Sequence, residues 1–109
     1  MHNQILGMKS DFFKALAHPT RVRILELLAQ GEEVCVCEII TDLGLEQSNV
    51  SQHLAILRKQ NIIVSTKAGL KVLYRIKHPA VLDILKLVQE ILAEQLMENQ
   101  ALMRHLAEN

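Results

Sequence analysis

The two cysteines of this 109-residue chain, Cys35 and Cys37, stand two positions apart. Thiolates bind soft ions such as Cd(II), Pb(II), Zn(II) or arsenite-type As(III), whereas Mg²⁺ and Ca²⁺ prefer oxygen ligands. The same pair could instead be oxidised or form a persulfide, or it could pack as two small apolar side chains. The elements that hold the two sulfurs decide between these chemistries.

The N-terminal segment lacks the basic start and long apolar stretch of a signal peptide, and no apolar run approaches the ~20 residues of a membrane span. We therefore expect a cytoplasmic protein without a membrane partner. Thiols stay reduced in that compartment, so a structural disulfide between Cys35 and Cys37 is not expected.

Length and composition predict a single domain over residues 1–109 that is mostly α, with a smaller β component (α+β). Half of the residues are hydrophobic but only 3% are aromatic, which is typical of packed helices with a Leu, Ile and Val core. Apolar periodicity together with Pro and Gly boundaries predicts five helices, at residues 3–17, 20–30, 34–42, 47–60 and from 79 to near the end. Strand-forming residues at 62–66 and 71–76 predict a two-stranded β-hairpin.

Charge is segregated along the chain although the net charge is zero. The segment from Gln47 to Leu82 has no Asp or Glu, and its six basic residues are Arg58, Lys59, Lys67, Lys71, Arg75 and Lys77. This segment carries +6 and the remainder carries −6, which is the electrostatic footprint of nucleic-acid binding. A solvated basic face is the alternative interpretation.

The third and fourth predicted helices, joined by a turn at Gly44, are typical of a helix-turn-helix. Val50, Leu54 and Leu57 form an inward stripe on the fourth helix and leave its amide and hydroxyl side chains outward. Such side chains hydrogen-bond base edges in the major groove. An ordinary surface helix with a polar outer face is the alternative.

The basic hairpin after this helix predicts a winged helix. Lys67 and Lys71 near the hairpin tip are placed to reach DNA phosphates, and Arg58 and Lys59 at the end of the fourth helix could also touch the DNA backbone. A winged helix used for protein association without DNA is a second non-enzymatic interpretation, and it predicts no salt-dependent duplex binding.

The last helix predicts a homodimer. Nine of the thirteen residues from Ala80 to Leu92 are apolar, so this helix needs more than one neighbour. Apolar residues of the first helix, Met8, Phe12 and Phe13, are candidates to join the interface. Two-fold symmetry would place two recognition helices ~34 Å apart and predicts an inverted-repeat operator in double-stranded DNA.

Three motifs, at residues 17–25, 33–39 and 47–57, together resemble the ArsR/SmtB family of metal-sensing bacterial repressors. The resemblance implies a homodimeric winged-helix repressor that leaves its operator when an inducer binds. By match to the family's recognition helix, the residues expected to face DNA are Gln47, Ser48, Asn49, Ser51, Gln52 and His53. His53 could contact phosphate, or it could be a partly buried packing residue.

The resemblance also bears on the thiols. Cys-Val-Cys at this place is the family's mark of arsenic, antimony, cadmium or lead sensing, which implies that Cys35 and Cys37 bind the inducer. Arsenic sensors often add a cysteine three positions later, where this chain has Ile40. Cadmium and lead sensors add cysteines in an N-terminal arm, and this chain has none there. His2, the N-terminal amine, an external thiol or water could complete the site.

Zinc sensing through the last helix is disfavoured. The family's zinc site there pairs Asp/His with His/Glu, whereas this chain offers Asp83 and Glu90 but Lys86 in place of a histidine. His105 falls too far along the helix.

In a regular helix, two residues separated by two positions differ by ~200° in direction, so one ion could bind both sulfurs only if the helix start were loosened. We expect that bending the third helix in this way would tilt the recognition helix against DNA. No catalytic constellation or phosphate-binding loop is found in the sequence, so neither an enzyme nor an obligatory cofactor is expected. An enzyme would have to turn over a substrate, for example by reducing arsenate through the thiols.

Overall fold

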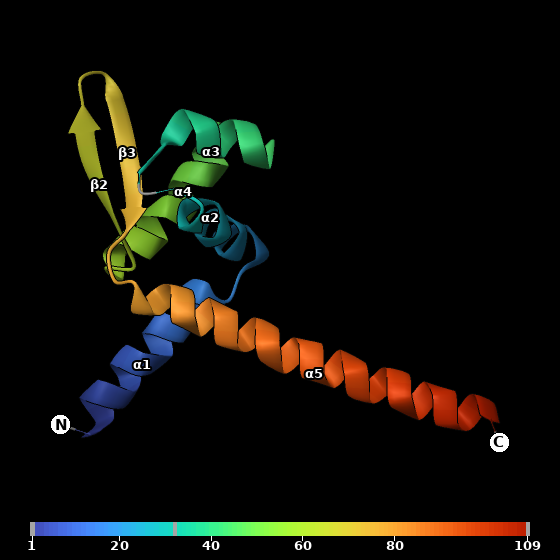
Figure 1. The fold of residues 1–109 in the computed structure, drawn as a ribbon. Coiled ribbons are helices and arrows are strands. Elements are labelled where there is room, and N and C mark those ends of the chain that lie inside the picture. The colour runs from blue at the N-terminus through green and yellow to red at the C-terminus, as the bar shows by residue number, and fades with distance from the viewer. Residues whose placement is uncertain (1, 32, 109) are drawn as a thin grey trace. The chain divides into compact units, whose positions relative to one another are not determined.

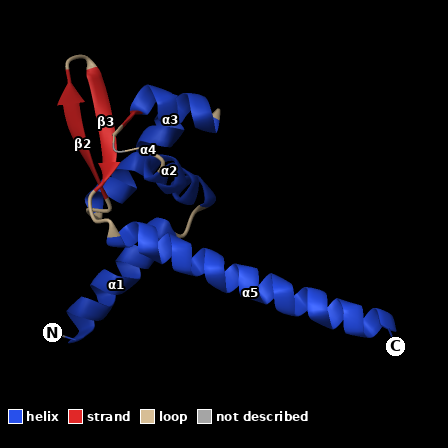
Figure 2. Cartoon of the chain, in the orientation of Figure 1, coloured by secondary structure: helices blue, strands red, loops and turns tan. Residues whose placement is uncertain are grey.

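The computed structural model describes residues 2–31 and 33–108. Its contacts divide the chain into two compact units, residues 1–78 and 79–109. Within the described ranges the chain has five helices and three strands (Figures 1 and 2). In chain order they are α1 (His2–Leu16), α2 (Pro19–Ala29), β1 (Val34–Cys35), α3 (Val36–Leu43), α4 (Gln47–Lys59), β2 (Ile63–Ala68), β3 (Lys71–Ile76) and α5 (Ala80–Glu108).

The core of the first unit lies where α2, α3 and α4 pack together and meet the sheet. Its fully buried side chains are aliphatic, as the composition predicts: Ile24, Leu25, Ile39, Val50, Leu54, Leu57, Ile62 and Ile63. Each Leu or Ile buried in this way contributes roughly 1.5–3 kcal/mol. The predicted inward stripe of α4 is therefore confirmed, and the opposite face of that helix is left to solvent.

Local signals set the ends of most helices. His18 has extended backbone and caps α2, and Pro19 follows at the first helical position. Proline is tolerated there because the backbone N–H of that position has no partner within the helix. Gly44 ends α3 in the left-handed conformation, at φ 65°. α1, α2 and α4 lie within one residue of their predicted ends, and α5 begins one residue after its predicted start.

The predicted start of the third helix is wrong. Val34 and Cys35 form the short strand β1, and α3 begins only at Val36. β1 pairs antiparallel with β3, which places Val34 opposite Tyr74 and Cys35 opposite Leu73. The hairpin is therefore part of a three-stranded sheet with the order β1-β3-β2. This pairing joins residues about forty positions apart, so it cannot be predicted from a local sequence pattern.

The hairpin itself is longer and tighter than predicted. β2 continues to Ala68, which pairs with Lys71, so the turn is only Gly69 and Leu70. Gly69 has φ 65°, and a positive φ at the first turn position suits the type II′ turns that match strand twist. The basic residues Lys67 and Lys71 consequently flank the tip.

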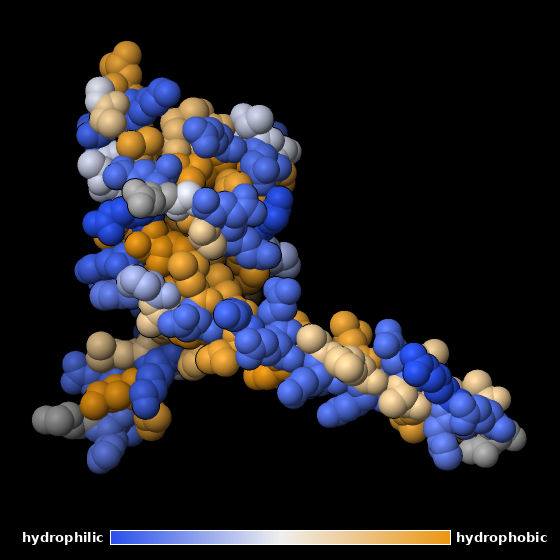
Figure 3. All heavy atoms as spheres, in the orientation of Figure 1, coloured by the Kyte–Doolittle hydropathy of each residue, from blue (hydrophilic) through white to orange (hydrophobic). Residues whose placement is uncertain are grey.

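The second unit consists of α5, a helix of 29 residues and about 44 Å at 1.5 Å per residue. Large apolar side chains are exposed along it: Leu87, Val88, Ile91, Leu92, Leu96, Met97, Leu102, Met103 and Leu106. In Figure 3, hydrophobic residues in orange alternate with hydrophilic residues in blue along this helix. Among the described residues, no helix is long and apolar enough to cross a membrane.

Candidate DNA-binding surface and thiol pair

The outward face of α4 is polar and open to solvent. The exposed residues that the sequence assigns to DNA on this face are Gln47, Ser48, Asn49, Ser51 and Gln52. The first turn of α4 contains no acidic side chain, and its last turn contains Arg58 and Lys59. This face can donate to and accept from base edges without placing a carboxylate against phosphate.

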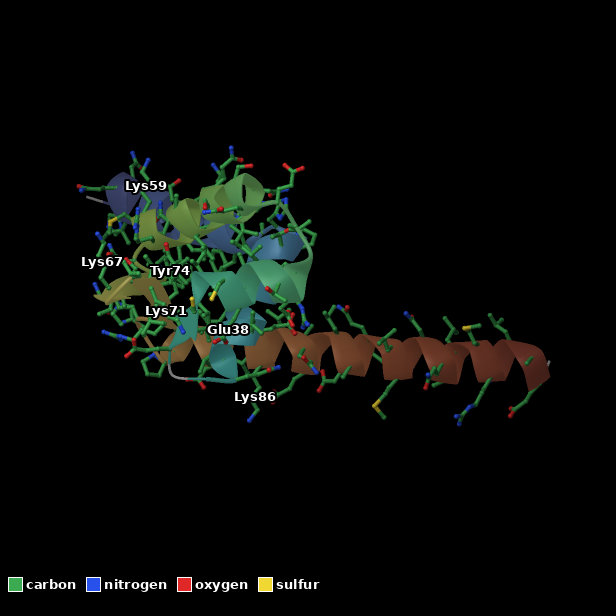
Figure 4. All side chains as sticks on the ribbon, turned by 90° about the horizontal axis from the view of Figure 1, so that it is seen from above. Glu38, Lys59, Lys67, Lys71, Tyr74 and Lys86 are labelled. Carbon is green, nitrogen blue, oxygen red and sulfur yellow. The ribbon has the colours of Figure 1, made fainter. Side chains whose placement is uncertain are left out.

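The basic side chains assigned to the DNA backbone are exposed as well. Arg58 and Lys59 end α4, whereas Lys67 and Lys71 lie on either side of the hairpin turn. Figure 4 shows Lys59, Lys67 and Lys71 toward the hairpin end of the unit. The residues predicted to contact phosphate thus lie on α4 and on the hairpin of β2 and β3 that follows it.

His53 is placed differently from the other residues of that helix. Its ring is half-buried, and its centroid lies 4.3 Å from that of His18. The Arg21 guanidinium lies 3.2 Å from His53 Nδ1. Burial, followed by the neighbouring His18 and Arg21, lowers the pKa of His53. These contacts favour the packing interpretation of His53 over a freely exposed phosphate ligand.

Sequence reasoning missed the role of Arg21. Besides His53, its guanidinium reaches the backbone carbonyls of Lys14 and Ala15 at the end of α1. Arg21 and His53 are 32 positions apart, so neither spacing nor charge pattern indicates the contact.

The two thiols lie at the junction between β1 and α3. Cys35 has extended backbone, with φ −67° and ψ 141°, and its Sγ accepts a hydrogen bond of 3.4 Å from the Cys37 backbone N–H. Cys35 is buried and Cys37 is exposed. Cys35 therefore caps α3 instead of lying inside it, and the geometry of a regular helix does not separate the two sulfurs.

The two thiols differ in acidity. A hydrogen bond from the Cys37 side chain is the main cause that lowers the pKa of Cys35, and the same contact raises the pKa of Cys37. The Lys71 ammonium adds a smaller effect that lowers the pKa of both thiols. Cys35 is therefore the more acidic of the two thiols and should lose its proton first.

No group of three or more His, Cys, Asp or Glu side chains among the described residues could hold a metal ion. Ile40, at the family's third cysteine position, is half-buried on α3. The exposed His2 belongs to no such group, and the N-terminal amine lies outside the described residues. The two thiols themselves are soft sulfur ligands, which would suit a thiophilic ion better than a hard one.

The chain matches the model of the family described as bacterial regulatory protein, arsR family, over residues 18–65. It is 36% identical to the uncharacterised HTH-type transcriptional regulator Rv0081 of Mycobacterium tuberculosis, over 91% of this chain and 87% of the relative. Its identity to the arsenical resistance operon repressor of Escherichia coli is also 36%, over 89% and 83% of the two chains.

Solved structures agree with these matches. The crystal structure of Rv0081 superposes with a TM-score of 0.81 at 38% identity, covering 87% of this chain and 95% of that one. The homodimeric winged helix-turn-helix domain of Mb0332 from Mycobacterium bovis, a possible ArsR-family regulator, has the same TM-score at 32% identity, covering 89% of each chain. The chain therefore belongs to the arsR family and is a winged helix-turn-helix DNA-binding transcriptional repressor, not an enzyme.

Proposed function

We propose that this repressor is a homodimer that binds an inverted-repeat operator and leaves it when a thiophilic metal or metalloid binds Cys35 and Cys37. The position of Cys35 carries the proposal. This residue caps α3, the first helix of the helix-turn-helix, and it also pairs with β3 of the hairpin. A ligand on its sulfur acts at once on both elements that support the DNA-binding surface.

DNA is read by the outward face of α4. Gln47, Asn49 and Gln52 offer amides that can pair with adenine, and Ser48 and Ser51 offer hydroxyls. Arg58, Lys59, Lys67 and Lys71 neutralise phosphates. Because each neutralised phosphate releases counterions, operator affinity should fall steeply with salt.

The subunits associate through α1 and α5. Ile5, Leu6, Met8 and Phe13 of α1 are exposed, as are the apolar side chains along α5. Exposed apolar surface on this scale is characteristic of an interface. The homodimeric state of Mb0332 supports the proposal, and a two-fold axis would place two copies of α4 about 34 Å apart on one side of the duplex.

The inducer is a soft ion such as As(III), Sb(III), Cd(II), Pb(II) or Zn(II). With arsenite, two S–H groups condense with As(OH)₃ to form two As–S bonds and release two waters. The remaining position keeps a hydroxide or takes an external thiol or a group from the second subunit. The names of two relatives, the arsenical repressor and the cadmium resistance regulatory protein of Listeria innocua, support this ligand class.

Release follows from competition for Cys35 Sγ. In the free protein this sulfur accepts from the N–H of Cys37 and caps α3, whereas coordination redirects its lone pairs to the ligand. Loss of a helix cap costs about 1 kcal/mol. A total coupling of ~1–3 kcal/mol would weaken operator affinity about 5–150-fold.

A second candidate is thiol sensing by oxidation or persulfide formation in the same fold. The unequal acidity of the thiols favours it, because Cys35 with its lowered pKa supplies a thiolate and the exposed Cys37 can act as the resolving thiol.

Operator release separates the candidates. A labelled duplex from the protein's own upstream DNA is titrated by fluorescence anisotropy, with As(III), Cd(II), Pb(II), Zn(II), peroxide and persulfide added in turn. Wild type should release DNA with at least one soft ion, and Cys35→Ser and Cys37→Ser should not. The double variant with both Cys35→Ser and Cys37→Ser contains no thiol, and it must still bind DNA to serve as a control. Release by oxidant alone selects the second candidate, and release of both single variants by soft ions excludes the thiol site.

A further inference from the structure

Arg21 is a side chain of α2 that joins three helices. Its Nε donates to the Ala15 carbonyl at 2.6 Å, and its Nη2 donates to the Lys14 carbonyl at 3.2 Å. Both carbonyls belong to the last turn of α1, where the backbone C=O groups have no N–H partner within the helix. The third nitrogen, Nη1, lies 3.2 Å from Nδ1 of His53 on α4.

His18 also contacts the His53 ring. It caps α2, since its Nδ1 accepts from the Thr20 N–H at 3.0 Å. Its ring centroid lies 4.3 Å from that of His53, with the planes tilted by 40°. His53 is therefore in contact with both a guanidinium and a second imidazole ring.

The protonation state of His53 follows from its partner. A guanidinium has donors and no acceptor, so the Arg21 contact requires Nδ1 of His53 to be an acceptor. His53 must then be neutral and carry its proton on Nε2. His18 and Arg21 are the titratable or charged side chains that act on the ring, and the α1 carbonyls accept from Arg21. Protonation of His53 would end the hydrogen bond and place two cations together.

From these contacts we infer that Arg21 is a positioning residue for operator binding, which acts through neutral His53 to fix α4 against the end of α1. The inference rests on the proposed role of α4 as the helix that reads DNA. Recognition side chains must be held within about 0.5 Å of their working geometry. The Arg21–His53 contact adds a polar link between α2 and α4 to the packing of the buried stripe. Arg21 joins the reading helix to α1, which the proposed dimer uses, and so relates subunit geometry to DNA register.

The test compares Arg21→Met with Arg23→Met. Arg23 lies two positions along α2, is exposed and pairs only at the surface with Asp42 at 3.3 Å. Arg21→Met is expected to weaken operator binding ~10–100-fold, the affinity equivalent of losing a hydrogen bond to a charged group. Arg23→Met should bind within about twofold of wild type. Circular dichroism under the binding conditions tests whether both variants are folded.

Salt dependence separates positioning from direct contact. A positioning residue leaves the slope of log affinity against log salt unchanged, whereas a lost phosphate contact reduces the slope by ~0.9. An unchanged slope in Arg21→Met supports the inference, and a slope reduced by about one contact overturns it. Wild-type affinity for Arg21→Met also overturns it. If wild type itself ignores its upstream DNA, the proposed function fails independently of this comparison.

Two substitutions of His53 keep the question open to test even if Arg21→Met fails to fold. Asn places an amide oxygen near the position of Nδ1 and can still accept from Arg21, whereas Gln places its amide beyond it. His53→Asn is expected to keep operator affinity within about threefold of wild type, and His53→Gln to lose as much as Arg21→Met. Wild-type affinity should also decline as the pH falls toward the pKa of folded His53, which lies below the ordinary histidine value, and this decline should be smaller in His53→Asn. Equal losses in the two variants, or identical pH profiles for His53→Asn and wild type, overturn the inference.

Discussion

At the scale of single residues, the two cysteines have different surroundings and so different chemistry. Cys35 is a buried helix cap and Cys37 an exposed residue of the first turn. Their shared hydrogen bond lowers the pKa of one and raises that of the other.

Removing one thiol should therefore shift the pKa of the other in a known direction. Cys37→Ala takes away the main cause that lowers the pKa of Cys35, so alkylation of Cys35 by iodoacetamide should shift to higher pH. Cys35→Ala takes away the main cause that raises the pKa of Cys37, so its alkylation should shift to lower pH. Mass spectrometry across a pH series measures both. Shifts in the opposite sense would show that the sulfurs do not share a hydrogen bond.

His53 gives a stability prediction with a definite sign. Burial, then His18 and Arg21, lowers its pKa in the folded state. A histidine of this kind contributes stability that is fully present above its ordinary pKa of about 6.5 and is lost as the pH falls through that value toward the folded pKa. The urea midpoint of wild type should drop more between pH ~7.5 and ~5.5 than that of His53→Asn. Equal drops in the two proteins would show that protonation of His53 does not cause the loss of stability at low pH.

The sequence predicts the residue types of both sites but not all of their contacts. Cys35, Cys37 and the polar face of α4 are visible as motifs because their members are neighbours in the chain. Arg21 and His53 meet only after α1, α2 and α4 have packed, so their contact depends on tertiary structure. The capping role of Cys35 was also missed, because helical periodicity assigned that residue to the helix.

At the scale of elements, the helices follow local rules and the sheet does not. Apolar spacing predicts α4, and Gly44 predicts the end of α3. Strand β1 has two residues, and it is a strand only because it pairs with β3, far along the chain. Secondary-structure patterns cover a few consecutive residues, so they place the hairpin but cannot place a partner strand this short.

The turn between α3 and α4 gives the next prediction. Gly44 has φ 65°, and an added Cβ would meet nothing within 4 Å, so the cost of substitution is backbone strain and not a clash. Gly44→Ala should destabilise the fold by ~1–2 kcal/mol, or roughly 5–10 °C in Tm. Gly44→Asn should cost less, since asparagine tolerates this conformation. Gly7→Ala, also without a Cβ clash, is the control inside a helix and should stabilise slightly by thermal denaturation.

The hairpin yields a prediction about DNA. Lys67→Ala and Lys71→Ala should each weaken binding to operator and unrelated duplex alike, because phosphate contacts do not depend on sequence. Each should reduce the salt slope by ~0.9, with Lys86→Ala of α5 as the matched control. Unaltered slopes in both hairpin variants would place the wing away from the DNA backbone.

At the scale of the whole molecule, apolar side chains remain exposed on α1 and along α5. An isolated repressor subunit would carry this surface into water, whereas a pair of subunits can cover it. In the proposed homodimer, this pairing would also determine how many operator half-sites are bound together.

A charge within the exposed apolar surface of α5 tests this arrangement. Leu92 is 53% exposed, and Leu92→Glu should yield a monomer in analytical ultracentrifugation. Operator affinity should fall by ~10²–10⁴ because the two half-sites are no longer bound as a linked pair. Gln95→Glu, the same charge change on the same helix, should remain dimeric. A dimeric Leu92→Glu protein with wild-type affinity would move the interface elsewhere.

The shortness of β1 has a consequence for the concentration at which the repressor responds. Two residue pairs join it to β3, and each backbone hydrogen bond contributes only about 0.5–1.5 kcal/mol net. If an inducer binds Cys35 as proposed, displacing so small a strand would cost it little of its own binding free energy. The dose that switches transcription should therefore lie close to the intrinsic dissociation constant of the sulfur pair. A longer strand would hold the wing more firmly, but it would raise the concentration of the proposed inducer that is needed for release.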